Sequence, residues 1–112
     1  MILALQEDGT LRVYPDPSSL ETAIEPLDIE ETLEAAFDEA GRPYVIEWLR
    51  QNTHSRTVLG VSIVENGEYR LVQRGAPDPA ALIQTIRTAT HFDPPSAEEF
   101  IRALEQELSQ RA

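Results

Sequence analysis

Two short apolar runs near the start of the chain predict a β-hairpin. Residues 2–6 (ILALQ) and 11–14 (LRVY) are rich in apolar side chains, and Asp8-Gly9 lies between them. An Asp-Gly pair between two such runs is a strong signal for a tight turn that joins antiparallel strands. The Pro-Asp-Pro sequence at 15–17 then ends the second strand.

The next stretch has the spacing of a short amphipathic helix. Its apolar residues recur at intervals of three and four: Leu20, Ala23, Ile24 and Leu27. We expect Ser18 and Glu21 to form a capping box at the start of this helix. Pro26 limits it to about two turns, because proline cannot continue a helix.

Residues 33–50 fit two structures. The composition around 31–40 (ETLEAAFDEA) favours a helix, and helix and strand both remain open for 33–38. The alternation along 43–50 and the glycine at position 41, which can take a positive φ, favour a hairpin instead. We therefore predict strands at 33–38 and 43–50, with Tyr44 and Trp48 on the same strand face.

A second hairpin is predicted from residues 56–64 and 68–74, which flank Asn66-Gly67. Apolar side chains occur on both faces of the first of these strands, so we expect it to be central and covered on both sides. Leu59, Val61 and Ile63 lie on one face, and Val58 and Val64 lie on the other.

Two helices are predicted at the end of the chain. The first spans 77–90, with Asp78 at the N-cap and Pro79 at the first helical position. The second starts at a capping box of Ser96 and Glu99. Its apolar stripe comprises Ala97, Phe100, Ile101, Leu104 and Leu108.

The predicted order ββ-α-ββ-ββ-α-α describes a single α+β domain over residues 1–112. Strand pairs come before or between helices, with no βαβ alternation. This arrangement favours an antiparallel sheet of about four to six strands with two or three helices packed on it.

Charge is distributed unevenly along the chain. The 20 acidic residues outnumber the nine arginines, for a net charge of -11, and residues 1–41 hold eleven of the acids but one arginine. This balance argues against nucleic acid or an anionic membrane as a partner, because both require basic patches. A cationic protein remains a suitable partner. The densest acidic stretch contains Glu21, Glu25, Asp28, Glu30, Glu31, Glu34, Asp38 and Glu39.

No pattern in the chain predicts catalysis, a metal or another cofactor. The absence of cysteine excludes disulfides and thiol chemistry. His54 and His91, the latter with Asp93 nearby, supply too few ligands for a metal site. Ser62 lacks the glycine pattern of a nucleophile elbow, and the five glycines form no phosphate-binding loop. The first ten residues lack the basic start of a signal peptide, and no apolar run could span a bilayer, so we expect a cytoplasmic protein.

Residues 12–48 resemble small bacterial immunity proteins encoded beside secreted polymorphic toxins. The resemblance consists of a strand that ends in Tyr, a short helix, an acidic turn and a "[FY]-D-x-x-G-R" hairpin. It implies a stoichiometric inhibitor that docks on a toxin domain in the cytoplasm of the producing cell and blocks its active site. The matching residues are Tyr14, Leu20, Ile24, Glu25, Leu27, Asp28, Phe37, Asp38, Gly41 and Arg42.

The charge pattern and this resemblance predict a non-enzymatic immunity protein that binds a cognate toxin with a cationic active site. Two alternatives remain open: a phage-type charge mimic that inhibits a nucleic-acid enzyme, and a small-ligand or structural module whose acids are merely solvated. The expected partner-binding residues are Glu25, Asp28, Glu30, Glu31, Glu34, Asp38 and Glu39, with Tyr44 and Trp48 as apolar anchors.

Overall fold

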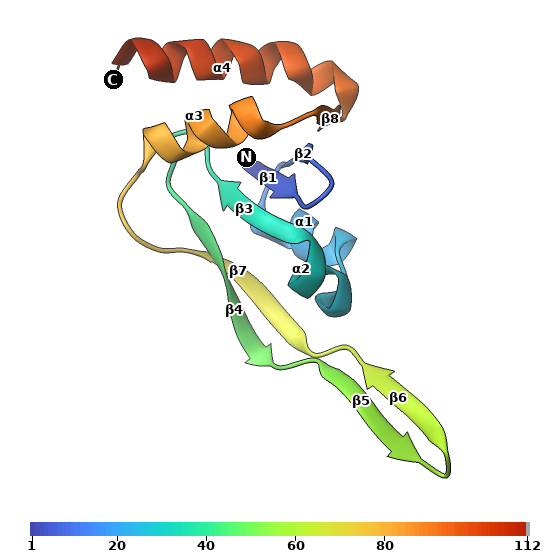
Figure 1. Cartoon of the computed structure of the whole chain (residues 1–112). Coiled ribbons are helices and arrows are strands. Elements are labelled where there is room, and N and C mark those ends of the chain that lie inside the picture. The colour runs from blue at the N-terminus through green and yellow to red at the C-terminus, as the bar shows by residue number, and fades with distance from the viewer. Residues whose placement is uncertain (112) are drawn as a thin grey trace.

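A four-stranded sheet lies at the centre of the molecule, with its strands in the order β3-β1-β2-β8 (Figure 1). The computed structural model describes residues 1–111, apart from the side chains of residues 54–58, 62 and 63. β1 pairs antiparallel with β2 and β3, and β8 lies parallel to β2. The bounds are β1 (Ile2–Gln6), β2 (Thr10–Tyr14), β3 (Leu33–Phe37) and β8 (His91–Asp93).

The chain is therefore an α+β protein, as the sequence predicts. The predicted hairpin of β1 and β2 is confirmed. Gly9 adopts a φ of 86°, which glycine accepts readily, and the Asp8 carboxylate accepts a 2.9 Å hydrogen bond from the Thr10 backbone N–H.

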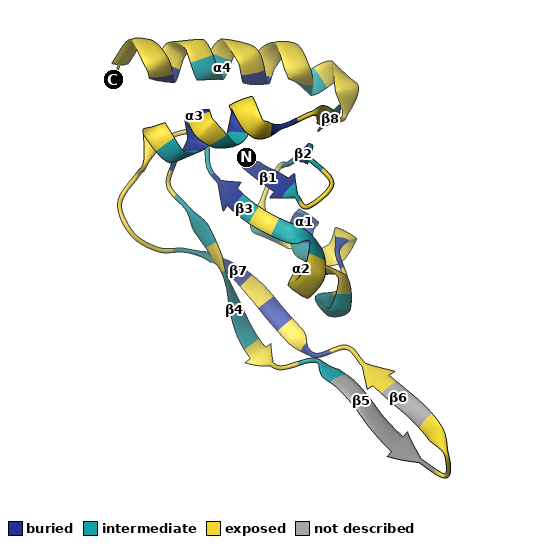
Figure 2. Cartoon of the chain, viewed as in Figure 1, coloured by how far each residue is buried: buried dark blue, intermediate teal, exposed yellow. Residues whose placement is uncertain are grey.

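β1 is buried on both faces and separates two hydrophobic clusters (Figure 2). Leu3 and Leu5 pack with α3 (Pro79–Thr88) and α4 (Glu98–Arg111) on one face. Ile2 and Ala4 belong to the cluster on the other face. That face is covered by α1 (Pro17–Ala23), α2 (Pro26–Thr32) and β7 (Glu68–Gln73).

Residues 33–37 form a strand, which decides between the two structures that the sequence allows. The pairing of β3 with β1 skips Glu34, since Leu5 pairs with Ala35 and Gln6 pairs with Leu33. A bulge of this kind leaves one residue unpaired, here Glu34, and interrupts the regular alternation of side chains between the two faces of the sheet. Leu33 and Ala36 consequently join the same cluster, and Glu34 is exposed.

The start of α1 differs from the predicted capping box. Asp16, and not Ser18, is the N-cap, and its side chain accepts a 2.7 Å hydrogen bond from the Ser19 N–H. The Glu21 carboxylate instead accepts a hydrogen bond from the backbone N–H of Leu71 in β7. Pro26 does follow the end of α1, but it also begins α2, because proline suits the first helical turn.

The predicted hairpin of 33–38 with 43–50 is wrong apart from one bridge between Phe37 and Pro43. β3 pairs with β1, and β4 (Tyr44–Arg50) pairs antiparallel with β7. The turn near Gly41 therefore redirects the chain from the central sheet into a separate two-stranded ribbon. Gly41 has a φ of 85°.

The hairpin predicted around Asn66-Gly67 is also wrong. The chain turns at Leu59-Gly60, so that β5 (Thr53–Val58) pairs with β6 (Val61–Glu65). We call residues 53–65 the arm, because they project from the body as a two-stranded extension of the ribbon (Figure 1). The molecule measures 60 × 28 × 20 Å in consequence.

The arm also contradicts the expected two-sided coverage of residues 56–64. Leu59, Val61 and Val64 are 99%, 62% and 52% exposed. The side chains of Val58 and Ile63 lie outside the described ones. The strand covered on both faces is β1.

The two C-terminal helices are confirmed, with one change at the start of the second. Asp78 caps α3, and its side chain accepts a hydrogen bond from the Ala81 N–H. Ser96 does not cap α4, because it lies within a short 3-10 turn, η1 (Pro95–Ala97), that leads into the helix. In the described chain, no helix has the length and apolar character that a bilayer crossing requires.

Candidate functional site

Four exposed carboxylates on and beside α2 form what we call the acidic face: Glu25, Asp28, Glu31 and Glu34. Glu25 precedes the first residue of α2, and Asp28 and Glu31 lie within the helix. Ile29 is fully buried and turns the opposite side of α2 toward the core. The bulge in β3 adds Glu34 three residues after Glu31, so local backbone structure brings these acids to the surface together.

The acidic face has no cationic partner among the described residues. Asp28 and Glu31 are also three residues apart on one helix, where like charges repel by a few tenths of a kcal/mol. The carboxylates of this face are thus exposed to water, and at least Asp28 and Glu31 repel each other. A cation from outside the chain would relieve that repulsion.

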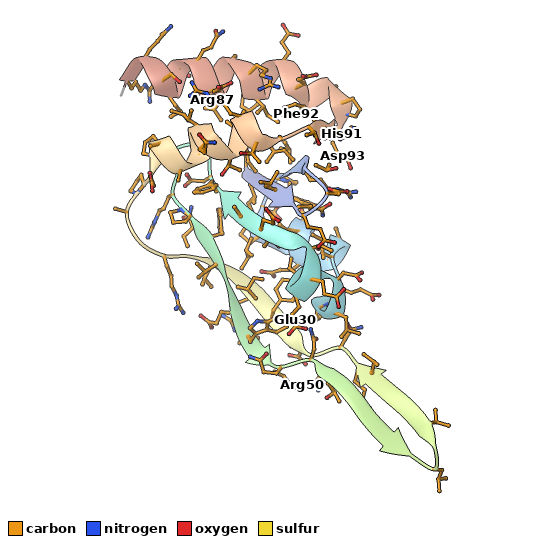
Figure 3. The ribbon with its side chains drawn as sticks, in the orientation of Figure 1. Glu30, Arg50, Arg87, His91, Phe92 and Asp93 are labelled. Atoms are coloured by element: carbon orange, nitrogen blue, oxygen red, sulfur yellow. The ribbon has the colours of Figure 1, made fainter. Side chains whose placement is uncertain are left out.

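Acids elsewhere are largely paired within the chain. Glu47 on β4 lies 3.9 Å from Arg70 on β7 and 3.3 Å from Arg74, the residue after β7. Arg87 of α3 lies between α3 and α4 (Figure 3). Its Nε is 2.6 Å from a carboxylate oxygen of Glu105 on α4. The acidic face therefore differs from the rest of the surface in two ways: its acids are closer together in sequence, and they form no ion pairs with described residues.

Two asparagines at the base of the arm hold the amino end of α2. The Asn66 side-chain oxygen accepts a 3.0 Å hydrogen bond from the Leu27 N–H, which the Glu25 side chain leaves uncapped. The Asn52 amide donates to the Pro26 carbonyl at 2.8 Å and to the Glu30 carboxylate at 2.9 Å. Figure 3 shows Glu30 and Arg50 near the point where the arm leaves the body.

Glu30 is therefore an acid of α2 with a structural partner, and it differs in this from its neighbour Glu31. The sequence did not single out Asn52 or Asn66 as residues that position the acidic helix. The local sequence pattern indicates a turn at Asn66, and only the fold brings its side chain to Leu27 of α2, 39 positions away in sequence.

Asp38 and Glu39 lie apart from the acidic face, beside the turn that follows β3. The Asp38 carboxylate accepts hydrogen bonds from the Ala40 and Arg42 N–H groups and from the Gln73 side chain. Burial alone would raise the pKa of Asp38, but these hydrogen bonds outweigh it and lower the pKa below 3.8. Glu39 lies 2.9 Å from the Met1 amino group. Both acids thus have partners within the chain.

Tyr44 and Trp48 are half-buried and pack against the cluster that contains Tyr69 and Leu71. The rings of Trp48 and Tyr69 are 5.8 Å apart and tilted by 59°, a favourable aromatic arrangement. Burial raises the pKa of Tyr44. These two side chains are packed on the core and can offer a partner only part of their surface.

Other sites carry less chemistry. Among the described side chains, which exclude His54, no group of three or more His, Asp or Glu could hold a metal. His91 contacts the Thr90 hydroxyl through Nδ1 at 3.0 Å, and the side chains of His54 and Ser62 lie outside the described ones. An apolar pocket of about 400 Å³ opens between the start of α3 and the end of α4. It is lined by Ala40, Pro77, Asp78, Pro79, Ala80, Leu108 and Arg111.

Comparisons with known proteins identify no relative. No protein-family model matches the chain, and no similar sequence or fold is found among curated proteins or solved structures. The function must therefore be argued from the surface itself.

Proposed function

We propose that this chain is a non-enzymatic binding protein that blocks a cationic partner through the acidic face, in the manner of a cytoplasmic immunity protein. The observation that carries the proposal is the contrast in charge pairing. The carboxylates of Glu25, Asp28, Glu31 and Glu34 have no cationic partner among the described residues. By contrast, ion pairs are formed by Glu47 on the β4–β7 ribbon and by three acids of α4, Glu98, Glu105 and Glu107.

Unpaired surface charge contributes mainly to the rate of encounter. A cluster of one sign raises the potential around that face and steers a partner of opposite sign toward it. The active site of a toxin that handles nucleic acid or nucleotides must itself be positive, since it binds phosphates. The acidic face would compete for such a site directly, and no chemistry by the inhibitor is needed.

The attachment of α2 favours a binding role as well. Asn66 and Asn52 fix the amino end of the helix by hydrogen bonds to Leu27 and Pro26, and Ile29 anchors its inner side in the core. A surface that is already ordered loses less conformational entropy on binding. Asp28 and Glu31 therefore lie on a preorganised helix, and Glu25 and Glu34 flank its two ends.

Isothermal titration against the protein encoded by the adjacent gene tests this function. We expect tight one-to-one binding at low salt. The variant D28N/E31Q/E34Q should weaken it at least about 10-fold, since each charged contact at an interface contributes on the order of 1 kcal/mol.

The matched control is E98Q/E99Q/E107Q, which removes the same number of charges from α4, far from the acidic face. It should bind almost as tightly as the wild type. Absence of binding at low salt, or equal losses in the two triple variants, would remove the proposal. Binding to a nucleic-acid enzyme of a bacteriophage host in place of the adjacent gene product would favour the charge-mimic alternative.

The pocket beside Leu108 and Pro79 favours a small-ligand module as the second candidate. Its lining is mostly apolar, so an apolar ligand is the expected occupant. A thermal-shift screen of apolar small molecules, repeated with Ala80→Trp to fill the pocket, distinguishes this candidate. A shift that the substitution abolishes would support it.

A further inference from the structure

The arm offers a second surface that has no partner within the chain. It is a two-stranded sheet, so β5 and β6 each present one row of backbone N–H and C=O groups that no other strand of the described residues pairs with. Its apolar side chains at Leu59, Val61 and Val64 are largely exposed. A two-stranded hairpin with no covering layer is marginally stable in water, so a further strand would stabilise the arm.

The two edges of the arm differ in how well they are protected. β5 contains a register shift between Thr53 and Arg56 and carries the only charge in its sequence at Arg56. Bulges and charged residues are the usual means by which edge strands avoid pairing. β6 also carries one charge, but this is Glu65, its last residue, at the base of the arm, and its pairing with β5 has no extra residue on the β6 side. The four residues before Glu65, Val-Ser-Ile-Val, are uncharged, and three of them are β-branched and apolar. The edge of β6 is therefore the one open to another strand.

We propose that β6 pairs with β6 of a second copy of this chain, which forms a four-stranded sheet β5-β6-β6-β5 across a two-fold axis. A strand that pairs with its own copy about such an axis is antiparallel, so every contact on one side is repeated on the other. The backbone N–H and C=O groups on the free edge of β6 then pair with the same groups of the second copy, so no second binding surface is needed.

Net charge also favours the arm as the contact between copies. Residues 53–65 hold one arginine and one glutamate, so the whole net charge of -11 lies outside them. Two bodies of that charge repel each other. The arm is neutral and projects away from the body (Figure 1), so it allows two copies to meet where repulsion is weakest.

The length of the arm decides how salt should act. Five strand residues span about 17 Å, which would hold the two bodies apart by roughly two Debye lengths at 0.15 M salt. The dissociation constant of the dimer should therefore change little as salt rises above about 0.15 M. At about 0.01 M salt the Debye length is about 30 Å, so the two bodies repel each other across the gap and the dimer should weaken. Binding through the acidic face has the opposite salt dependence, so this inference stands apart from the proposed function.

Sedimentation velocity on the full chain tests the proposal at concentrations up to about 1 mM. We expect the 12.5 kDa monomer to give way to a species of twice that mass as concentration rises. Val61→Lys should raise the dissociation constant at least about 10-fold, because a charge on the edge blocks strand pairing. Val45→Lys is the matched control, since Val45 is exposed on β4, outside the arm, and the charge change is the same.

Spin labels give a second readout that does not depend on a destabilising variant. The chain has no cysteine, so a single Thr57→Cys label on β5 is specific. In the sheet β5-β6-β6-β5, the two β5 strands are separated by three strand spacings, so the labelled backbones would lie about 15 Å apart. Ser109 belongs to α4, the helix at the opposite end of the molecule from the arm (Figure 1), so labels at Ser109→Cys should be much farther apart. A monomer at every concentration, equal effects of the two lysine substitutions, or distances at position 57 no shorter than at 109 would overturn the proposal.

Discussion

Gly67 passes so close to Arg50 that a β-carbon on residue 67 would lie 2.0 Å from the Arg50 carbonyl oxygen. The Gly67 N–H also donates a 2.7 Å hydrogen bond to the Asn52 side chain. The contact lies where the β4–β7 ribbon ends and the arm begins, between the Arg50–Glu68 pair and the Thr53–Glu65 pair. The glycine is needed there for space, and not for a left-handed turn.

Gly67→Ala should therefore destabilise the protein. The clash is with backbone, which cannot move aside cheaply, so we expect a loss of about 2–3 kcal/mol in the free energy of unfolding, measured in urea. Gly75→Ala is the control, because Gly75 has a φ of 86° but no atom near the position of a β-carbon. It should lose only about 1 kcal/mol, from backbone strain. Equal losses would mean that the contact with Arg50 is not tight.

Asp38→Ala should lower stability through the turn after β3. The substitution leaves the Ala40 and Arg42 N–H groups without their acceptor, which costs about 1–3 kcal/mol. The same hydrogen bonds hold the pKa of Asp38 below 3.8, so the ionised carboxylate stabilises the fold above that pH, and the stabilisation is lost as pH falls through the folded pKa. Urea titrations from pH 7 to 2 should show a smaller acid dependence in Asp38→Ala than in the wild type. An unchanged profile would show that Asp38 does not hold the turn.

Tyr69 should make the protein sensitive to base. Burial raises the pKa of Tyr69 to about 12, and its hydroxyl donates a 2.7 Å hydrogen bond to the Ile24 carbonyl. Because the folded pKa lies above the ordinary value of 10, the stabilisation is complete below pH 10 and is lost as pH rises toward 12. Tyr69→Phe should lose about 1 kcal/mol at pH 7 and show a weaker decline above pH 10. A decline of the same size in both proteins would assign the effect to another group.

D28N/E31Q/E34Q should fold as well as the wild type. Relief of repulsion between these acids offsets the loss of the favourable position of Asp28 near the start of α2, so the free energy of unfolding should change by less than about 0.5 kcal/mol. Thermal and urea unfolding measure this directly. A loss above about 1.5 kcal/mol would mean that the carboxylates serve the fold and would weaken their assignment to a partner.

The sequence predicts those elements whose signals are local. Asp8-Gly9 and the Asp78-Pro79 start of α3 specify their own backbone geometry, and both were predicted correctly. Asn66-Gly67 resembles Asp8-Gly9 in sequence, but it forms no hairpin turn. Glycine is needed at position 67 because the backbone of Arg50 and Gln51 lies too close for a β-carbon, and no local sequence pattern indicates this contact. The true turn at Leu59-Gly60 places a leucine at a φ of 52°, a conformation that leucine seldom adopts.

The candidate site was predicted only in part, for a similar reason. The density of acids around α2 is visible in the sequence, but their pairing is not. Asp38, Glu39 and Glu30 find partners from remote segments, namely Gln73, Met1 and Asn52. Glu34 is exposed because a bulge shifts the register of β3 against β1, and this too depends on tertiary pairing.

Hydrogen–deuterium exchange on the complex with the adjacent gene product tests the central claim most directly. We expect the amides of residues 25–34 to gain protection on binding, because the partner covers α2 and the bulge of β3. The amides of α3 and α4 should exchange as in the free protein. Protection confined to α3 and α4, with residues 25–34 unchanged, would contradict the assignment of the acidic face as the binding surface.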